Sequence, residues 1–315
     1  MKRATGRAPG KIILVGEHSV VYGHPAIAMP VQSVGAEIVT ELSRNGGVRI
    51  EVPDLKGDAQ AGKRAVEAVK RLVDRMLGLF REDAQGLTLS VRSDIPIACG
   101  MGSSAALCVA TVRAICDLFG RHLADEEIAS LAFDGERIFH DSPSGIDNHV
   151  VALGKPIYFV KRKGASPIKV GPTAFRFLIA DTGIASPTAE IVAEVRESHV
   201  VDRARYDALF WEMGSMSSMA REVIRARAGS RAELGMCMDR NQELLRSLGV
   251  SCDPVDRLVV AAKEAGAAGA KLTGAGRGGN VIALLGDDTD EAALSAALRA
   301  AGAKQVLEAE LTPSG

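Results

Sequence analysis

The chain has 315 residues, which is enough for two domains of ordinary size, each with its own hydrophobic core. Its 38 lysine and arginine residues against 39 aspartate and glutamate residues give a formal net charge of −1, so no overall field attracts nucleic acid or anionic lipid. With 47% hydrophobic residues and no apolar run near the roughly 20 residues that cross a bilayer, the composition predicts a soluble globular protein. We expect neither nucleic acid nor a membrane as a partner.

The first residues and the cysteines indicate the compartment. Met1-Lys2-Arg3 precedes a short apolar run, Ile12–Val15, which is too short for the core of a secretory signal. The five cysteines are odd in number and form no C-x-x-C pair, which argues against a disulfide framework and a zinc knuckle. We therefore expect a reducing, cytoplasmic compartment.

The first half of the chain predicts short strands around three helices. Strands rich in β-branched residues are expected at 11–15, 35–42, 48–52 and 87–92. Apolar residues at three- and four-residue spacings predict helices at 61–80, 103–119 and 125–140. These strands favour a mainly antiparallel sheet.

The second half predicts a different mixture. Strands at 156–160 and 175–180 flank a segment rich in Lys, Gly and Pro, and we place a domain boundary there, giving domains 1–168 and 169–315. The chain is then mostly helical to residue 262. It ends with strands at 270–273 and 281–285, a helix at 291–301 and a strand at 305–311. Since helices and strands do not alternate strictly, we predict the α+β class.

A glycine-rich turn, residues 96–106, runs directly into a predicted helix. Gly100 and Gly102 let backbone approach a ligand, and the first turn of the helix offers free N–H groups and a favourable dipole to a phosphate. Ser103 and Ser104 add hydroxyls that can bind phosphate or Mg²⁺. A capped helix start without a ligand explains the same residues equally well.

Two carboxylates, Glu136 and Asp147, lie on either side of a helix end and a Pro-Ser-Gly turn. The fold could bring them together, one to hold a metal ion and the other to handle a proton. From this stretch alone, a solvated and capped helix end is the better explanation.

Residues 271–280 contain a G-x-G-x-x-G match that does not indicate a dinucleotide site, because residues 281–285 predict a strand where that fingerprint needs a helix. We expect a wide glycine loop between two strands, either against a ligand or as a simple hairpin loop. The chain has no P-loop and no protein-kinase HRD and DFG pair.

Residues 9–23 place Lys11 at the start of a predicted strand and Glu17-His18 just past its end. A lysine near a proton acceptor can favour the alkoxide of a substrate hydroxyl. Taken singly, Lys11 would more often be a surface charge and His18 a hydrogen-bonded loop residue.

Together, these four segments resemble the signature motifs of the GHMP kinases, in order over residues 8–285. Gly16-Glu17-His18-Ser19-Val20-Val21-Tyr22-Gly23 is similar to the motif of the mevalonate kinase branch. The resemblance implies an N-terminal domain like the second domain of ribosomal protein S5 and a ferredoxin-like C-terminal domain. It also implies transfer of the ATP γ-phosphoryl group to the C5 hydroxyl of mevalonate, with Mg²⁺ as cofactor.

The resemblance also implies the site residues. Asp147 and Lys11 are the expected catalytic pair, and Ser104 and Glu136 the expected Mg²⁺ ligands. The residues expected to bind ATP are Pro96, Gly100, Met101, Gly102, Ser103, Ser104 and Ala105. Those expected to contact mevalonate are Glu17, His18, Asp147, Thr188, Ala275 and Arg277.

Two departures concern the acceptor. The segment 181–188 has no Lys or Arg, where the family usually has basic residues, and Arg277 stands where the family usually has glycine. Our hypothesis is that Arg277 holds the mevalonate carboxylate; contact with ATP phosphate or solvent is the alternative. Another GHMP kinase, acting on phosphomevalonate or a sugar, and an inactive metabolite-binding homologue also stay open. Methionine-rich helices are expected in the core, with a homodimer surface as the alternative.

Overall fold

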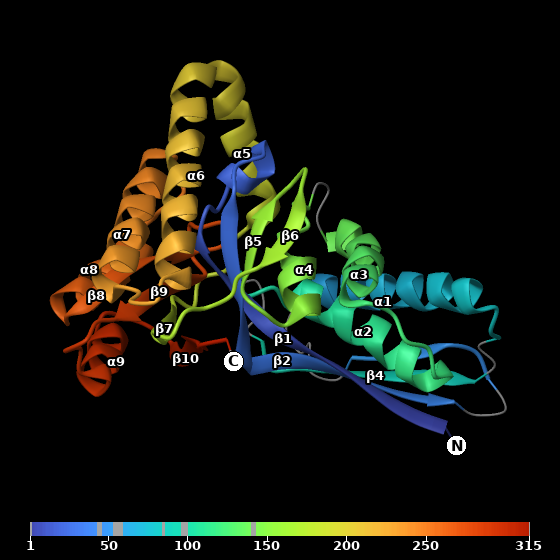
Figure 1. Ribbon diagram of the computed structural model, residues 1–315. Helices are drawn as coiled ribbons and strands as arrows, with labels where there is room; N and C mark the ends of the chain where they lie inside the picture. Colours follow the sequence, from blue (N-terminus) through green and yellow to red (C-terminus); the bar gives the residue numbers. More distant parts are fainter. Residues whose placement is uncertain are drawn as a thin grey trace. The chain divides into compact units, whose positions relative to one another are not determined.

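A computed structural model describes residues 2–42, 46–52, 59–83, 86–95, 100–139 and 143–314 (Figure 1). Contacts divide the chain into two compact units. Unit 1 combines Met1–Lys11, Val34–Pro96 and Gly102–Gly154, and unit 2 combines Ile12–Ser33, Ile97–Met101 and Lys155–Gly315. The long strands β1 (Lys2–Val15) and β2 (Ala26–Leu42) supply residues to both units. The domain boundary at residue 168 stays a prediction.

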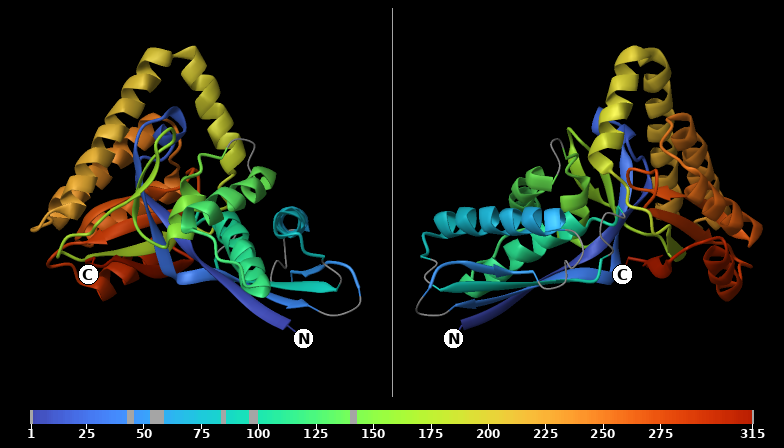
Figure 2. Two further views of the ribbon diagram at one scale, coloured as in Figure 1. Left: turned by 45° about the vertical axis from the view of Figure 1, so that its right-hand side comes forward. Right: turned by 180° about the vertical axis from the view of Figure 1, so that it is seen from behind.

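Unit 1 is a layer of strands with helices on one face (Figures 1 and 2). Its strands besides β1 and β2 are β3 (Arg49–Glu51) and β4 (Leu87–Ser93), of which β4 pairs antiparallel with β2 and parallel with β3. Its helices are α1 (Ala59–Phe80), α2 (Ser103–Phe119), α3 (Asp125–Phe139) and α4 (Ile146–Leu153). The predicted helices are confirmed to within a few residues at their ends, whereas α4 was not predicted.

Helix α2 is the central helix of unit 1. It is apolar on nearly all sides, as expected for a helix surrounded by protein, and it contacts α1, α3 and α4. Gly102 (φ +72°) begins it and Gly120 (φ +63°) ends it, so glycines occupy both left-handed positions.

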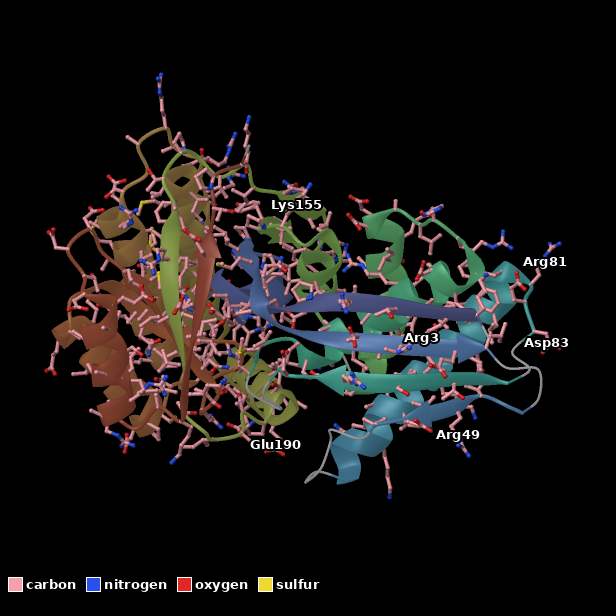
Figure 3. The ribbon with its side chains drawn as sticks, turned by 90° about the horizontal axis from the view of Figure 1, so that it is seen from below. Arg3, Arg49, Arg81, Asp83, Lys155 and Glu190 are labelled. Atoms are coloured by element: carbon pink, nitrogen blue, oxygen red, sulfur yellow. The ribbon has the colours of Figure 1, made fainter. Side chains whose placement is uncertain are left out.

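The other face of the unit 1 strands is open to solvent. Alternate residues of β1 are exposed, and cross-strand pairs such as Arg3–Glu41 (3.6 Å) and Arg7–Glu37 (2.6 Å) lie along it. Figure 3, a view from below, shows the labelled Arg3 and Arg49 at this layer of strands. The apolar side chains of unit 1 therefore face the helices.

Unit 2 contains a four-stranded antiparallel sheet in the order β10-β7-β9-β8. Its strands are β7 (Phe175–Asp181), β8 (Ala267–Thr273), β9 (Asn280–Leu285) and β10 (Gln305–Leu311). Its helices are α5 (Thr188–Val201), α6 (Arg203–Arg225), α7 (Arg231–Ser247), α8 (Asp253–Glu264) and α9 (Glu291–Ala300). The β-α-β-β-α-β order is ferredoxin-like. The α+β class is therefore confirmed.

The remaining elements of unit 2 are short. Strands β5 (Ile157–Val160) and β6 (Gly164–Pro167) form a hairpin beside the first residues of β2, and a 3₁₀ turn η1 (Ser19–Tyr22) follows β1. Strand β6, the first half of β2 and residues 2–10 of β1 were not predicted.

The core of unit 2 fixes the glycine loop. Phe210, Met213, Leu258, Val281 and Leu294 are among the buried side chains between the helices and the sheet. Burial holds β8 and β9 in register, with Thr273 opposite Asn280, so residues 274–279 form the predicted loop between two strands. No helix in the described part of the chain combines the length and apolarity that a bilayer crossing requires.

Candidate active site

Lys11 and Asp147 form an ion pair within unit 1. The Lys11 ammonium nitrogen lies 3.0 Å from Asp147 Oδ2, and the side chains are 3% and 27% exposed. Lys11 comes from β1, and Asp147 from the first turn of α4. Helix α4 begins at Gly145 with φ +88°, a left-handed conformation that glycine adopts without strain. The unpredicted helix thus explains how the Pro-Ser-Gly turn directs Asp147 toward Lys11.

Glu136 of α3 lies close to this pair. Its side chain is buried, and burial together with the nearby Asp147 charge raises the pKa of Glu136 to about 7. A hydrogen bond from Ser104 and the Lys11 charge act in the opposite direction. Glu136 Oε1 has no hydrogen-bond partner among the residues that the structure describes. A buried carboxylate oxygen without a partner is costly unless something else binds it.

The residues present fit a Mg²⁺ ion. Within the described ranges no group of three or more His, Cys, Asp or Glu side chains could form a complete metal cage. Mg²⁺ commonly uses one or two carboxylates, with nucleotide phosphates and water completing its coordination. The unpartnered Glu136 oxygen, with the Ser104 hydroxyl beside it, supplies a donor set of that kind.

The glycine-rich turn leads into the N-terminus of α2. The backbone N–H groups of Ser103, Ser104 and Ala105 belong to the first turn, whose N–H groups have no partner within the helix. Gly100, which belongs to unit 2, packs so closely that an added Cβ would lie 3.2 Å from the Thr273 carbonyl oxygen. Met101 is buried, and Pro96 lies outside the described residues.

A second polar cluster lies in unit 2. Glu17 follows β1 and is 1% exposed; its carboxylate contacts the Lys271 ammonium group and accepts a hydrogen bond from Asn241 Nδ2 at 2.9 Å. Lys271 and Asn241 are completely buried. Sequence reasoning missed these two residues. The signal for Lys271 was a lysine within an otherwise apolar strand, 267–273.

His18 lies beside this cluster in a left-handed conformation, φ +58°. Its Nε2 is 2.9 Å from the Ala275 carbonyl oxygen. Burial, and then the positive charges of Arg277 and Lys271, lower the pKa of His18, against the opposing effect of that hydrogen bond. The imidazole is therefore neutral near pH 7, with Nε2–H as the donor to Ala275.

Arg277 lies in the glycine loop with φ +50°. Its guanidinium group lies 2.6 Å from Glu194 of α5, and its Nε donates to the Gly249 carbonyl at 3.2 Å. The predicted contact residue Thr188 begins α5, at the end of a segment that Ser186 links to the Gly276 carbonyl at 2.6 Å. The structure thus brings Thr188, Ala275, Arg277 and His18 into one unit.

Comparison with known proteins identifies the class. The model of the GHMP kinases N terminal domain matches residues 63–155, and that of the GHMP kinases C terminal domain matches residues 219–304. Together they cover more than half of the chain, which therefore belongs to the GHMP kinase family.

Within this family, the chain is similar to mevalonate kinases. It is 37% identical to that of Thermococcus sibiricus, over 97% of this chain and 95% of the relative. The crystal structure of the L. major mevalonate kinase in complex with R-mevalonate matches with a TM-score of 0.85 at 29% identity, over 99% of this chain and 96% of that one. The Methanococcus jannaschii mevalonate kinase matches with a TM-score of 0.80 at 26% identity, over 99% and 98%.

Proposed function

We propose that the chain is an ATP-dependent kinase that phosphorylates the C5 hydroxyl of mevalonate, giving 5-phosphomevalonate and ADP in isoprenoid biosynthesis. The single observation that carries the chemistry is the ion pair between Lys11 and Asp147 at 3.0 Å. The similarity to mevalonate kinases over almost the whole chain supports the choice of acceptor.

The ion pair supplies the groups that the acceptor hydroxyl needs. The hydroxyl oxygen forms a bond to the γ-phosphorus, the bond from that phosphorus to the β,γ-bridging oxygen breaks, and the hydroxyl proton passes to Asp147. Lys11 lies beside the carboxylate and stabilises negative charge on the attacking oxygen. Since phosphoryl transfer has a loose transition state, positioning of the hydroxyl contributes more than complete deprotonation before attack.

The segment that leads into α2 provides an ATP phosphate site. The N-terminal turn of α2, from Ser103 to Ala105, and the Gly100–Gly102 turn would bind phosphate oxygens with backbone N–H groups. Ser104 and Glu136 would hold Mg²⁺, which neutralises phosphate charge when bound. We assign cofactor binding to these residues on the basis of the helix start and the unpartnered Glu136 oxygen.

For the acceptor, we propose contacts from His18, Thr188 and Ala275, in addition to Asp147. The direct contacts predicted for Glu17 and Arg277 stay predictions, because their charged groups pair with Lys271 and Glu194 in this structure. A cytoplasmic location and a homodimer are further proposals, which fractionation and the mass of the protein in solution would test.

ADP release with ATP and Mg²⁺ tests the function. The acceptors are mevalonate, phosphomevalonate, homoserine and galactose, and mass spectrometry identifies the product. We expect turnover with mevalonate only. Turnover with phosphomevalonate or galactose alone would indicate another GHMP kinase activity, which the segment 181–188, without a basic residue, keeps as the second candidate. Turnover with none would favour a metabolite-binding protein.

A further inference from the structure

Lys271 is a charged side chain of unit 2 with no place in the proposed chemistry. It lies in β8 and is completely buried. We infer that Lys271 is a positioning residue for the acceptor, which acts through Glu17 to fix the turn that carries His18. This inference rests on the proposed function, because it concerns the binding of the acceptor in that reaction.

The contacts of Lys271 converge on Glu17. Its ammonium group donates to Glu17 Oε1 and to the Leu272 carbonyl oxygen. Glu17 Oε2 accepts from Asn241 Nδ2 at 2.9 Å, so both carboxylate oxygens are engaged by buried groups. Because Lys271 and Asn241 each bind one oxygen of the Glu17 carboxylate, that side chain has a single orientation. The backbone of the turn on either side of Glu17 is fixed with it.

Stability alone does not explain this ion pair. Burial lowers the pKa of Lys271, and only the neighbouring Glu17 opposes that effect. Removing two charges from water is costly, and a well-packed apolar pair of similar volume is often as stable or more stable. The best-attested use of buried polar pairs is to select one arrangement of the chain. Here the pair joins a turn near the start of the chain to a strand near its end.

The turn that is fixed carries His18. Gly16 has φ +100° and His18 φ +58°, and the Ser19 N–H donates to the Glu17 carbonyl at 2.6 Å. The His18 ring is held by the carbonyl of Ala275, which follows Lys271 closely in the chain. Strand β8 and its loop therefore hold this turn at two points, the Glu17 carboxylate and the His18 imidazole. If the contact to the Glu17 carboxylate is lost, His18 stays in a strained backbone conformation, and only its own hydrogen bond to the Ala275 carbonyl oxygen still holds the turn to β8 and its loop.

A direct contact between Glu17 and the acceptor is the competing explanation. In that case the carboxylate must stay at position 17, whereas a positioning role requires only a buried ion pair between positions 17 and 271. The two explanations therefore differ in a protein in which the charges are exchanged.

The test compares two double variants at a temperature well below the melting temperature of each. The neutral pair Glu17→Gln/Lys271→Met removes both charges, which avoids leaving one buried charge alone. We expect a melting temperature near that of the wild type, a KM for mevalonate raised about tenfold or more, and a KM for ATP within about twofold. A purely structural role would not separate the two KM values. A neutral pair with an unchanged KM for mevalonate would overturn the inference.

The reversed pair Glu17→Lys/Lys271→Glu then separates the two explanations. We expect it to restore the KM for mevalonate to within about threefold of the wild type. A KM as high as that of the neutral pair would assign Glu17 to direct contact and overturn the inference. If the reversed pair does not fold, Lys271→Met replaces it, since that variant keeps the Glu17 carboxylate and removes only its buried partner; a KM for mevalonate near that of the wild type would then overturn the inference. The control is Lys263→Met, which removes a lysine that pairs with Asp239 (2.7 Å) at 38% exposure, and it should leave both KM values unchanged. A wild-type protein without mevalonate turnover would instead contradict the proposed function.

Discussion

A Cβ atom on Gly102 would lie 2.6 Å from the Cγ of Lys11, closer than any real side-chain contact. The glycine before α2 therefore gives the Lys11 side chain the room in which it lies against Asp147. The start of α2 and the Lys11 side chain are therefore coupled by packing. The first prediction follows from this coupling.

Gly102→Ala should lower kcat at least about tenfold, because the new methyl group displaces Lys11. It also places alanine at φ +72°, which costs roughly 1–2 kcal/mol. Gly120→Ala is the matched control, since Gly120 has φ +63° and no atom within 4 Å of an added Cβ. Both variants should lose similar stability in urea unfolding, while only Gly102→Ala loses activity. Equal kcat values for the two variants would contradict the proposed position of Lys11.

Asp147→Asn should lower kcat by about 10²–10⁴, the usual contribution of a positioned proton acceptor. The affinity for ATP, measured by calorimetry, should change little, because the nucleotide contacts assigned above come from the α2 segment. Asp125→Asn is the control: Asp125 lies in the first turn of α3 and pairs with Arg113 at 3.8 Å. An Asp147→Asn enzyme with wild-type kcat would remove Asp147 from its role.

Glu136→Gln should raise the Mg²⁺ concentration needed for half-maximal activity by about tenfold or more, since a neutral amide replaces the carboxylate proposed to bind the ion. A Mg²⁺ titration at saturating ATP measures this value. Glu126→Gln changes an exposed carboxylate in the first turn of the same helix and should have no effect. An unchanged Mg²⁺ requirement in Glu136→Gln would assign the metal to other residues.

His18 should make the protein less stable in mild acid. Its pKa is lowered in the folded state, by burial first and then by Arg277 and Lys271, so the unfolded chain binds more protons below about pH 6.5. The free energy of unfolding that the lowered pKa of His18 contributes is complete above about pH 6.5. It is lost as the pH falls from there toward the pKa of His18 in the folded state.

His18→Asn tests this, because asparagine tolerates the left-handed backbone better than most residues. The decrease in melting temperature from pH 7.5 to 5.5 should be smaller in this variant than in the wild type. His122→Asn, which changes an exposed histidine, is the control. An equal decrease in wild type and His18→Asn would show that His18 does not titrate in this way.

The hypothesis that Arg277 binds the mevalonate carboxylate now has a two-sided test, because Glu194 holds the guanidinium group at 2.6 Å. Arg277→Gly should raise the KM for mevalonate. Glu194→Gln should lower it, since it releases Arg277 from its partner. If Arg277 only braces the loop, the two variants will affect thermal stability and leave the KM for mevalonate unchanged.

Much of this molecule could be predicted from local sequence. The helices of unit 1 other than α4 follow from apolar periodicity, and its strands follow from β-branched residues except for residues 2–10 of β1, which were missed. The loop at 274–279 follows from its glycines and the strand after it. Helix α4 was missed because it is short and begins at a Pro-Ser-Gly turn, which favours a loop locally. Its helical state depends on packing against α2 and α3.

The sequence by itself determined the family, the α+β class and the residue types of a phosphoryl-transfer site, because these depend on motifs whose order and spacing are local. Only the tertiary structure decided that Lys11 meets Asp147, that Glu136 keeps an unpartnered oxygen, and that Lys271 is buried against Glu17. These relationships join residues far apart in the chain. Burial and the proximity of charges set their energies, and both exist only after the chain has folded.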